Sequence, residues 1–122
     1  MLDAKFDFPV NIGLFRYVEA MSTKEKLKPL DDMALAHAAN CLKILANPNR
    51  LQIVQLLLTE KTFSVNEISS HCELSQPTTS DHLRLMQRCG LLKSKKEGRA
   101  VYYEIAEPHL QDIMQCVQKQ FG

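Results

Sequence analysis

Hydrophobic positions recur every three or four residues over most of the chain, which is the spacing of amphipathic α-helices. Asp31 and Asp32 supply an N-cap and a negative first turn, and the apolar face that follows predicts a helix ending near Ala46. Asn47 and Pro48 restart the chain as N-cap and first helical residue, where the missing N–H of proline costs nothing. The residues after Pro48 are almost wholly apolar, so we expect this helix to be the most buried element.

The middle of the chain carries the start and stop signals of two further helices. Ser64 and Glu67 have the spacing of a capping box, which predicts a short helix ending near His71. Ser75 caps the next helix, and Gly90 can adopt the left-handed conformation that terminates it. Two short helices joined by a tight turn predict a helix-turn-helix.

Alternating hydrophobic and polar residues predict two strands, over residues 91–95 and 100–105, with an exposed tip at residues 97–99. From Glu107 onward apolar residues again recur at helical spacing, which predicts a final amphipathic helix. The predicted fold is therefore mainly α with a small β-hairpin wing, a winged helix-turn-helix. The apolar stripe of the last helix needs a partner, and a second copy of the chain is the most economical one, so we expect a dimer.

Residues 1–30 differ from the rest of the chain. Ile12, Phe15 and Val18 recur at three-residue spacing, which favours a helix with one apolar face, and residues 22–30 are typical of a linker. We interpret this extension as an arm for dimerisation or packing, with a contribution to an effector pocket as the alternative. The expected organisation is an N-terminal extension over residues 1–30 and a winged helix-turn-helix domain over residues 31–122, with a C-terminal dimerisation helix.

Composition limits the class of protein without naming it. The chain has 122 residues, enough for one domain, and its 15 basic and 14 acidic side chains leave a net charge of +1. No stretch has the length of apolar sequence that a membrane span needs, and the first residues do not match a signal peptide, so we expect a cytoplasmic protein without a membrane partner. The four cysteines occur singly, without the spacing of a zinc ribbon, which predicts free thiols and no cofactor.

Local charge is more informative than net charge. Residues 75–104 contain six basic and three acidic side chains, and phosphate contacts come from such clusters. In the first turn of the second helix, Gln76 can pair with adenine while a threonine methyl group can meet thymine. The candidate DNA contacts are Ser75, Gln76, Thr78, Thr79, Asp81, His82, Arg84, Lys95, Lys96 and Arg99.

Two of these candidates have competing interpretations. Asp81 would be repelled by phosphates unless it accepts a hydrogen bond from a cytosine amino group, and otherwise it faces solvent. His82 lies at the border of the apolar face, where a structural histidine is the alternative to a ligand contact. Lys95, Lys96 and Arg99 flank the predicted hairpin tip, where they can contact phosphates or the minor groove, although a solvated hairpin carries similar residues.

Several linked motifs resemble the ArsR/SmtB family of bacterial transcriptional regulators, over about residues 38–121. They are Leu45 to Ile53, Leu74 to Thr78, His82-Leu83, Gly90-Leu91-Leu92, and Glu97-Gly98-Arg99 through Val101-Tyr102-Tyr103. The resemblance implies a homodimer that binds a pseudo-palindromic operator in double-stranded DNA, usually as a repressor released by an inducer. Asp81 departs from the Arg, Gln or His common there in the family.

The sensing sites that the family uses are not found in full. The arsenic and cadmium type needs cysteines near residues 63–66, and the sulfide-responsive type needs them at Gln55 and Gly122. The zinc type is matched by Glu107 to His109 alone, because its partners would fall at Gln120 and beyond. A possible set unlike these sites consists of His37, Cys41, Asp112 and Cys116, with His109 as a further metal-ligand candidate.

The leading hypothesis is thus a homodimeric repressor without the usual metal sites, regulated by an unidentified inducer if by any. Alternatives are a thiol-redox or metal-responsive sensor that uses Cys41 and Cys116, and a winged-helix interaction module that does not bind DNA. An enzyme is not expected, because His71 and Cys72 are the only adjacent pair of these residue types and no glycine-rich oxyanion arrangement accompanies them.

Overall fold

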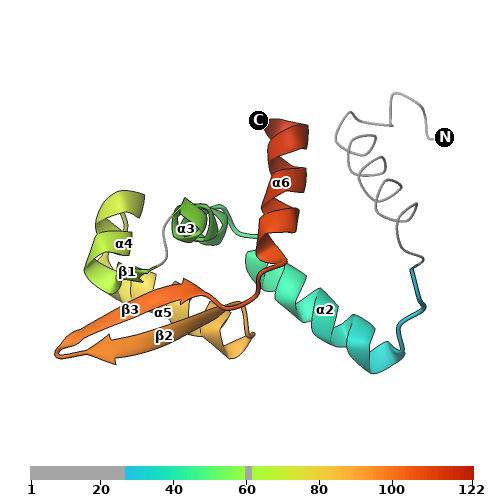
Figure 1. Ribbon diagram of the computed structural model, residues 1–122, viewed down its shortest axis with the longest axis horizontal. Coiled ribbons are helices and arrows are strands. Elements are labelled where there is room, and N and C mark those ends of the chain that lie inside the picture. The colour runs from blue at the N-terminus through green and yellow to red at the C-terminus, as the bar shows by residue number, and fades with distance from the viewer. Residues whose placement is uncertain (1–26, 60–61) are drawn as a thin grey trace. The chain divides into compact units, whose positions relative to one another are not determined.

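The computed structural model describes residues 27–59 and 62–122, and Figure 1 shows the order of their elements. The helices are α2 (Asp32–Leu45), α3 (Pro48–Thr59), α4 (Val65–Cys72), α5 (Gln76–Arg88) and α6 (Leu110–Phe121). The strands are β1 (Phe63–Ser64), β2 (Leu92–Glu97) and β3 (Ala100–Ile105). The predicted mainly α fold with a hairpin wing is confirmed, whereas the predicted arm helix around Phe15 lies outside the described residues.

The helix boundaries follow from side chains that cap the free backbone groups. Asp31 accepts a hydrogen bond from the backbone N–H of Ala34 at 2.8 Å, and Asn47 Oδ1 accepts from Asn49 N at 2.9 Å. The side chain of Ser64 accepts from the backbone of Glu67 at 3.1 Å, while that carboxylate accepts from Ser64 N at 2.8 Å. The predicted caps and the capping box are therefore confirmed.

The sheet has one strand more than the sequence predicted. Its strand order is β1-β3-β2, all antiparallel, and Phe63 of β1 lies opposite Tyr103 of β3. β1 is only two residues long, too short to show an alternating pattern. β2 extends to Glu97, beyond the predicted end at Lys95, and Gly98 at the tip has a φ of 63° that favours glycine.

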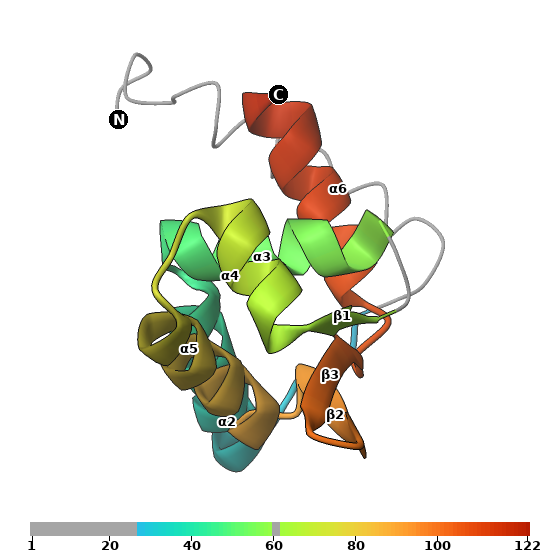
Figure 2. The ribbon, with the colours of Figure 1, turned by 90° about the vertical axis from the view of Figure 1, so that its left-hand side faces the viewer.

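Residues 31–110 form one compact unit, and residues 111–122 belong to a second. In the first unit α3 packs on α2, α4 and β3, while α5 packs on α2, α4 and β2 (Figure 2). α3 buries Ile53, Val54 and Leu57, and α5 buries Thr79, Leu83 and Met86. The expectation that α3 is the most buried element is not confirmed, because α5 buries as many residues.

Gly90 ends α5 as predicted. Its φ is 85°, and the backbone N–H of Leu91 returns to the carbonyl of Met86 at 3.0 Å. Both Leu91 and Leu92 are then buried, which fixes the start of the hairpin against the end of α5. Among the described residues, no helix combines the length and the apolar character needed to cross a membrane.

Candidate nucleic-acid interface

The first turn of α5 presents small polar side chains to solvent. Ser75 caps the helix, because its Oγ accepts from Thr78 N at 3.2 Å and its hydroxyl donates to Thr78 Oγ1 at 2.9 Å. Pro77 lies inside this first turn, where it needs no hydrogen-bond acceptor. Ser75, Gln76, Pro77 and Thr78 are all exposed. This end of the helix can therefore approach a groove without first removing a bulky side chain.

Gln76 is held in place by the preceding helix. Its Nε2 donates to Oδ1 of Asn66, a residue of α4, at 2.5 Å. One amide hydrogen and the carbonyl oxygen of Gln76 stay available, and these are the groups that pair with N7 and the amino group of adenine. Asn66 was not predicted to have a role, because its partner is ten residues away and belongs to another helix.

Thr79 does not belong to this exposed surface. Its side chain is fully buried, with an exposed fraction of 0%, and its hydroxyl donates to the carbonyl oxygen of Ser75 at 2.9 Å. The prediction that Thr79 contacts a base is wrong, because a side chain sealed beneath the helix cannot reach a groove. The threonine next to it, Thr78, keeps the exposed position.

Asp81 and Arg84 neutralise each other one turn further along α5. Arg84 Nη2 lies 2.7 Å from Asp81 Oδ1, and their side chains are 62% and 75% exposed. The interpretation of Asp81 as a solvent-facing residue fits this geometry, and its charge is balanced within the helix. A surface pair of this kind contributes little to stability and separates readily, so Arg84 remains able to turn to a phosphate.

His82 joins two helices instead of pointing freely to solvent. Its Nδ1 accepts a hydrogen bond from Arg50 Nε at 3.0 Å, and Arg50 Nη1 also donates to the carbonyl of Ile44 at 3.1 Å. Burial, followed by the charge of Arg50, lowers the pKa of His82, whereas Asp81 raises it. The geometry favours the structural interpretation of His82 over a DNA contact. Arg50 was not predicted as its partner, because the two residues are 32 positions apart.

The wing carries both paired and unpaired cations. Lys93 lies 3.5 Å from a carboxylate oxygen of Glu104, and Lys95 lies 3.4 Å from one of Glu97. Lys96 and Arg99 form no ion pair within the part of the chain that the structure describes. Gln87 Nε2 donates to Ser94 Oγ at 3.0 Å and so links α5 to β2. The two unpaired cations lie on the same hairpin that this bond connects to α5.

The proposed sensor residues are only partly brought together. His37 Nε2 is 3.8 Å from Cys41 Sγ, but the Cys41 thiol also lies 3.7 Å from the carbonyl of Cys89. Among the described residues, no group of three or more His, Cys, Asp or Glu has the arrangement of a metal site. Asp112 and Cys116 lie on α6 in the second compact unit, so their pairing with Cys41 stays a prediction.

His109 has a local partner instead of the zinc-type set. Its Nδ1 lies 2.6 Å from Glu107 Oε2, and the same oxygen accepts from the backbone N–H of His109 at 2.9 Å. The hydrogen bond from that backbone N–H, followed by the one from the ring, lowers the pKa of Glu107. The two residues thus form a short turn immediately before α6.

Comparison with known proteins agrees with this arrangement. Residues 47–94 match the family model described as bacterial regulatory protein, arsR family. The transcriptional activator HlyU of Vibrio cholerae is 37% identical over 84 residues, which cover 69% of this chain and 77% of that protein. The transcriptional repressor PagR of Bacillus anthracis is 36% identical over 88 residues, covering 72% and 88%.

Solved structures share the same fold. HlyU superposes with a TM-score of 0.67 at 34% identity, covering 75% of this chain and 98% of that one. A homodimeric winged helix-turn-helix DNA-binding domain from Mycobacterium bovis has a TM-score of 0.64 at 29% identity, covering 75% and 87%. The arrangement of α4, α5 and the hairpin as a winged helix-turn-helix agrees with these comparisons. The chain therefore belongs to the arsR family of bacterial regulatory proteins and is a winged helix-turn-helix transcriptional regulator.

Proposed function

We propose that this protein is a cytoplasmic homodimeric repressor that inserts α5 into the major groove of a pseudo-palindromic operator. The exposed first turn of α5, with Gln76 held by Asn66, is the observation that carries the proposal. A recognition helix reads bases with residues at its N-terminal end, and a prearranged side chain loses less conformational freedom when it binds. Gln76 and Thr78 would read bases in this arrangement.

The wing would supply contacts that do not depend on sequence. Lys96 and Arg99 have no carboxylate partner among the described residues, so DNA phosphates can bind them without first breaking an ion pair. Lys95 and Arg84 each have a partner and would contribute less, because part of their attraction to phosphate is already offset. Counterion release from the DNA would make the binding strongly dependent on salt.

Dimerisation is supported by apolar side chains left exposed on α2. Met33, Leu35 and Leu42 are 82%, 52% and 55% exposed, although large apolar residues on a monomer are usually covered when they gather on one helix. The solved domain from Mycobacterium bovis is described as homodimeric. Repression is the sign we propose, as in PagR, while HlyU is named an activator.

The experiment compares the affinity for a duplex from the protein's own promoter with that for a scrambled duplex, by fluorescence anisotropy over a range of salt. We expect Gln76→Ala to lower the ratio of the two affinities by about tenfold, since a bidentate base contact contributes about 1–3 kcal/mol of discrimination. Lys96→Gln and Arg99→Gln should weaken both duplexes alike and reduce the salt slope by about one each.

Lys28→Gln is the matched control, because it removes one exposed positive charge from a residue that belongs to neither α5 nor the wing. Equal losses for promoter and scrambled DNA in Gln76→Ala would contradict the assignment of α5 as the reading helix. Binding that does not change with salt would favour an interaction module over a DNA-binding regulator.

A further inference from the structure

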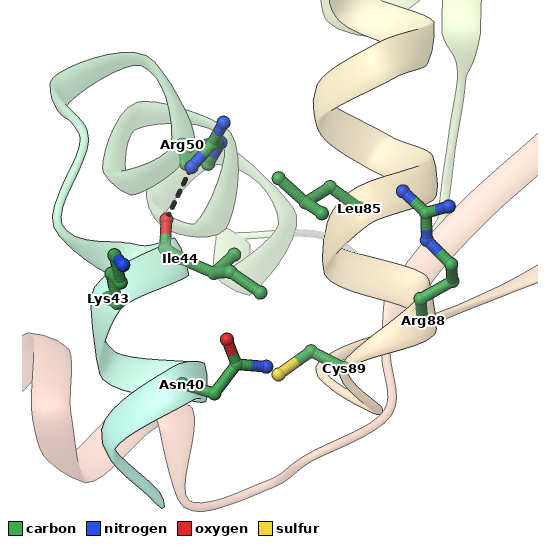
Figure 3. Close-up of a pocket in the computed structure, with 7 residues that line it drawn as sticks. All are labelled: Asn40, Lys43, Ile44, Arg50, Leu85, Arg88 and Cys89. Carbon is green, nitrogen blue, oxygen red and sulfur yellow. Dashed lines mark hydrogen bonds between the residues drawn. The ribbon is translucent and has the colours of Figure 1, made fainter. Parts of the chain in front are cut away.

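A pocket of about 460 Å³ lies behind the recognition helix, between α2, α3 and α5 (Figure 3). Its volume is within the range of sites that bind small molecules. The lining residues are Asn40, Lys43, Ile44, Arg50, Leu85, Arg88 and Cys89. None of them belongs to the first turn of α5 or to the wing, so the pocket is lined by other residues than those proposed to read bases.

The lining is strongly positive. Lys43, Arg50 and Arg88 contribute three cations, and no lining residue is a carboxylate. Lys43 and Arg88 form no ion pair with any residue in the described ranges. Cys89 adds no opposing charge, because burial, followed by the neighbouring Cys41 thiol, raises the pKa of Cys89 to about 11 and keeps it neutral. An anion would therefore meet no negatively charged side chain in the lining.

The rest of the lining is suited to an organic molecule. Ile44 and Leu85 extend toward the space from α2 and α5, and the amide of Asn40 can both donate and accept hydrogen bonds (Figure 3). Apolar walls with a few polar groups are typical of small-molecule sites, and an arginine can bind a carboxylate or a phosphate through two parallel hydrogen bonds. A simple inorganic anion would leave the apolar walls uncovered.

We propose that this pocket binds a small organic anion, a carboxylate or phosphate ester on a compact apolar body, as the effector that controls DNA binding. This inference rests on the proposed function for its regulatory part and deepens it by naming the class of inducer. The pocket has a direct connection to the recognition helix, because Leu85 and Arg88 belong to the last turns of α5.

Arg50 provides a second connection. Its guanidinium already donates to the carbonyl of Ile44 on α2 and to His82 on α5, at 3.1 and 3.0 Å. An anion in the pocket would compete for these donors and so loosen the link between α3 and α5. A ligand shifts an equilibrium only through different affinities for the two states, and this competition supplies such a difference. We expect the anion to lower the affinity for the operator.

Binding is tested first without DNA, by following backbone amide signals of the full chain by NMR. The probes are benzoate and phenyl phosphate, with uncharged benzamide as the matched control. We expect the two anions to shift the signals of Asn40, Lys43 and Leu85 with dissociation constants on the order of 1 mM, as for other small fragments, and benzamide to shift them far less.

Substitutions then test whether the positive side chains of the pocket bind the anion. Lys43→Gln and Arg88→Gln should each weaken benzoate binding roughly fivefold, a loss reduced by solvent around these exposed side chains, whereas Lys28→Gln should not change it. Lys43 and Arg88 lie in the last turns of α2 and α5, where their positive charges also interact favourably with the helix dipoles. Equal binding of benzamide and benzoate, or no shift with either anion, would overturn the proposal. The two cations would then have only their role at the helix ends.

The regulatory part is tested by adding the same probes to the complex with promoter DNA. We expect phenyl phosphate to release the DNA from the unsubstituted protein at lower concentrations than from Lys43→Gln, which should bind DNA normally without ligand. NMR shifts without such a difference would refute the effector role. Failure to bind promoter DNA in the absence of any probe would instead refute the proposed function. The NMR result would still show whether the pocket binds an organic anion.

Discussion

Neighbouring residues at the start of α5 have opposite roles. Thr78 is exposed and lies beside the cap residue Ser75, whereas Thr79 is sealed in the core with its hydroxyl on a backbone carbonyl. The helical step of 100° per residue is enough to turn one side chain outward and the next one inward. Their sequence, two consecutive threonines, contains no signal that separates the two roles.

A different substitution tests each of these threonines, and valine suits Thr79 because it keeps the shape and removes the hydroxyl. Thr79→Val should reduce the free energy of unfolding by about 1 kcal/mol, the usual contribution of a hydrogen bond, with little change in the preference for promoter DNA. At Thr78 the methyl group is the proposed thymine contact, so Thr78→Ala should instead lower the preference for promoter DNA with little change in stability. Chemical denaturation and anisotropy measure the two quantities, and a loss of DNA preference in Thr79→Val alone would contradict this division.

His82 makes stability depend on pH. Its pKa in the folded protein is below the ordinary value of 6.5, so the unfolded chain binds the proton more readily. The free energy of unfolding should therefore fall as the pH drops from 6.5 toward the folded pKa, and the contribution should be lost below it. Urea denaturation between pH 5 and 8, the range in which histidine titrates, measures how the free energy of unfolding changes with pH.

His82→Asn is the informative variant for this prediction, because its side-chain oxygen can still accept the hydrogen bond from Arg50 but cannot titrate. The slope just below pH 6.5 should be smaller in this variant. An unchanged slope would assign the pH dependence to another group.

At the scale of elements, α4 positions α5 as well as packing against it. The capping box at Ser64 and Glu67 fixes where α4 begins, and this places Asn66 in its first turn, within reach of Gln76. β1 ends at the same serine and pairs with β3, so one short segment connects the wing to the support of the recognition helix. Under the proposed function, the start of α4 would thus support base reading through its hydrogen bond to Gln76.

Removing the support should therefore affect recognition indirectly. Asn66→Ala should lower the preference for promoter over scrambled DNA by a fewfold, because Gln76 then has to be ordered on binding. Since Asn66 is exposed, stability should change little. Combined with Gln76→Ala, the second change should add almost nothing, and full additivity in this double-mutant cycle would contradict the coupling.

At the scale of the whole molecule, a net charge of +1 conceals a strongly positive stretch over residues 75–104. Apolar side chains are also unevenly distributed, because Leu42 on α2 is 55% exposed although it is a large apolar residue. Assembly of two copies would cover such positions and place two recognition helices on one operator. Affinity for the full operator would then depend on dimerisation.

Leu42→Glu tests this dependence. The added charge should oppose burial at an interface, shift the protein toward the monomer in analytical ultracentrifugation and weaken the binding of a two-site operator at least tenfold. Gln52→Glu is the matched control, since it adds the same charge at an exposed polar position of α3. A Leu42→Glu protein that remains dimeric would exclude this part of α2 from the interface.

The sequence alone determined the features that depend on residues close together in the chain. The caps at Asp31, Asn47, Ser64 and Ser75 and the stop at Gly90 each act within about one helical turn, so their residue types were sufficient to place the helices. The wing and the positive stretch were predictable for the same reason. The order of these elements along the chain predicted the winged helix-turn-helix, and the family motifs agreed with it.

Only the tertiary structure decided which of the candidate residues are available. Thr79 is buried in the core, and Gln76 is hydrogen-bonded to Asn66. His82 accepts a hydrogen bond from Arg50, which is 32 positions away in the sequence. β1 forms because Phe63 pairs with Tyr103 of β3, a residue far from it in the sequence. Contacts between distant segments depend on how whole helices and strands pack, so the local periodicity of the sequence does not predict them.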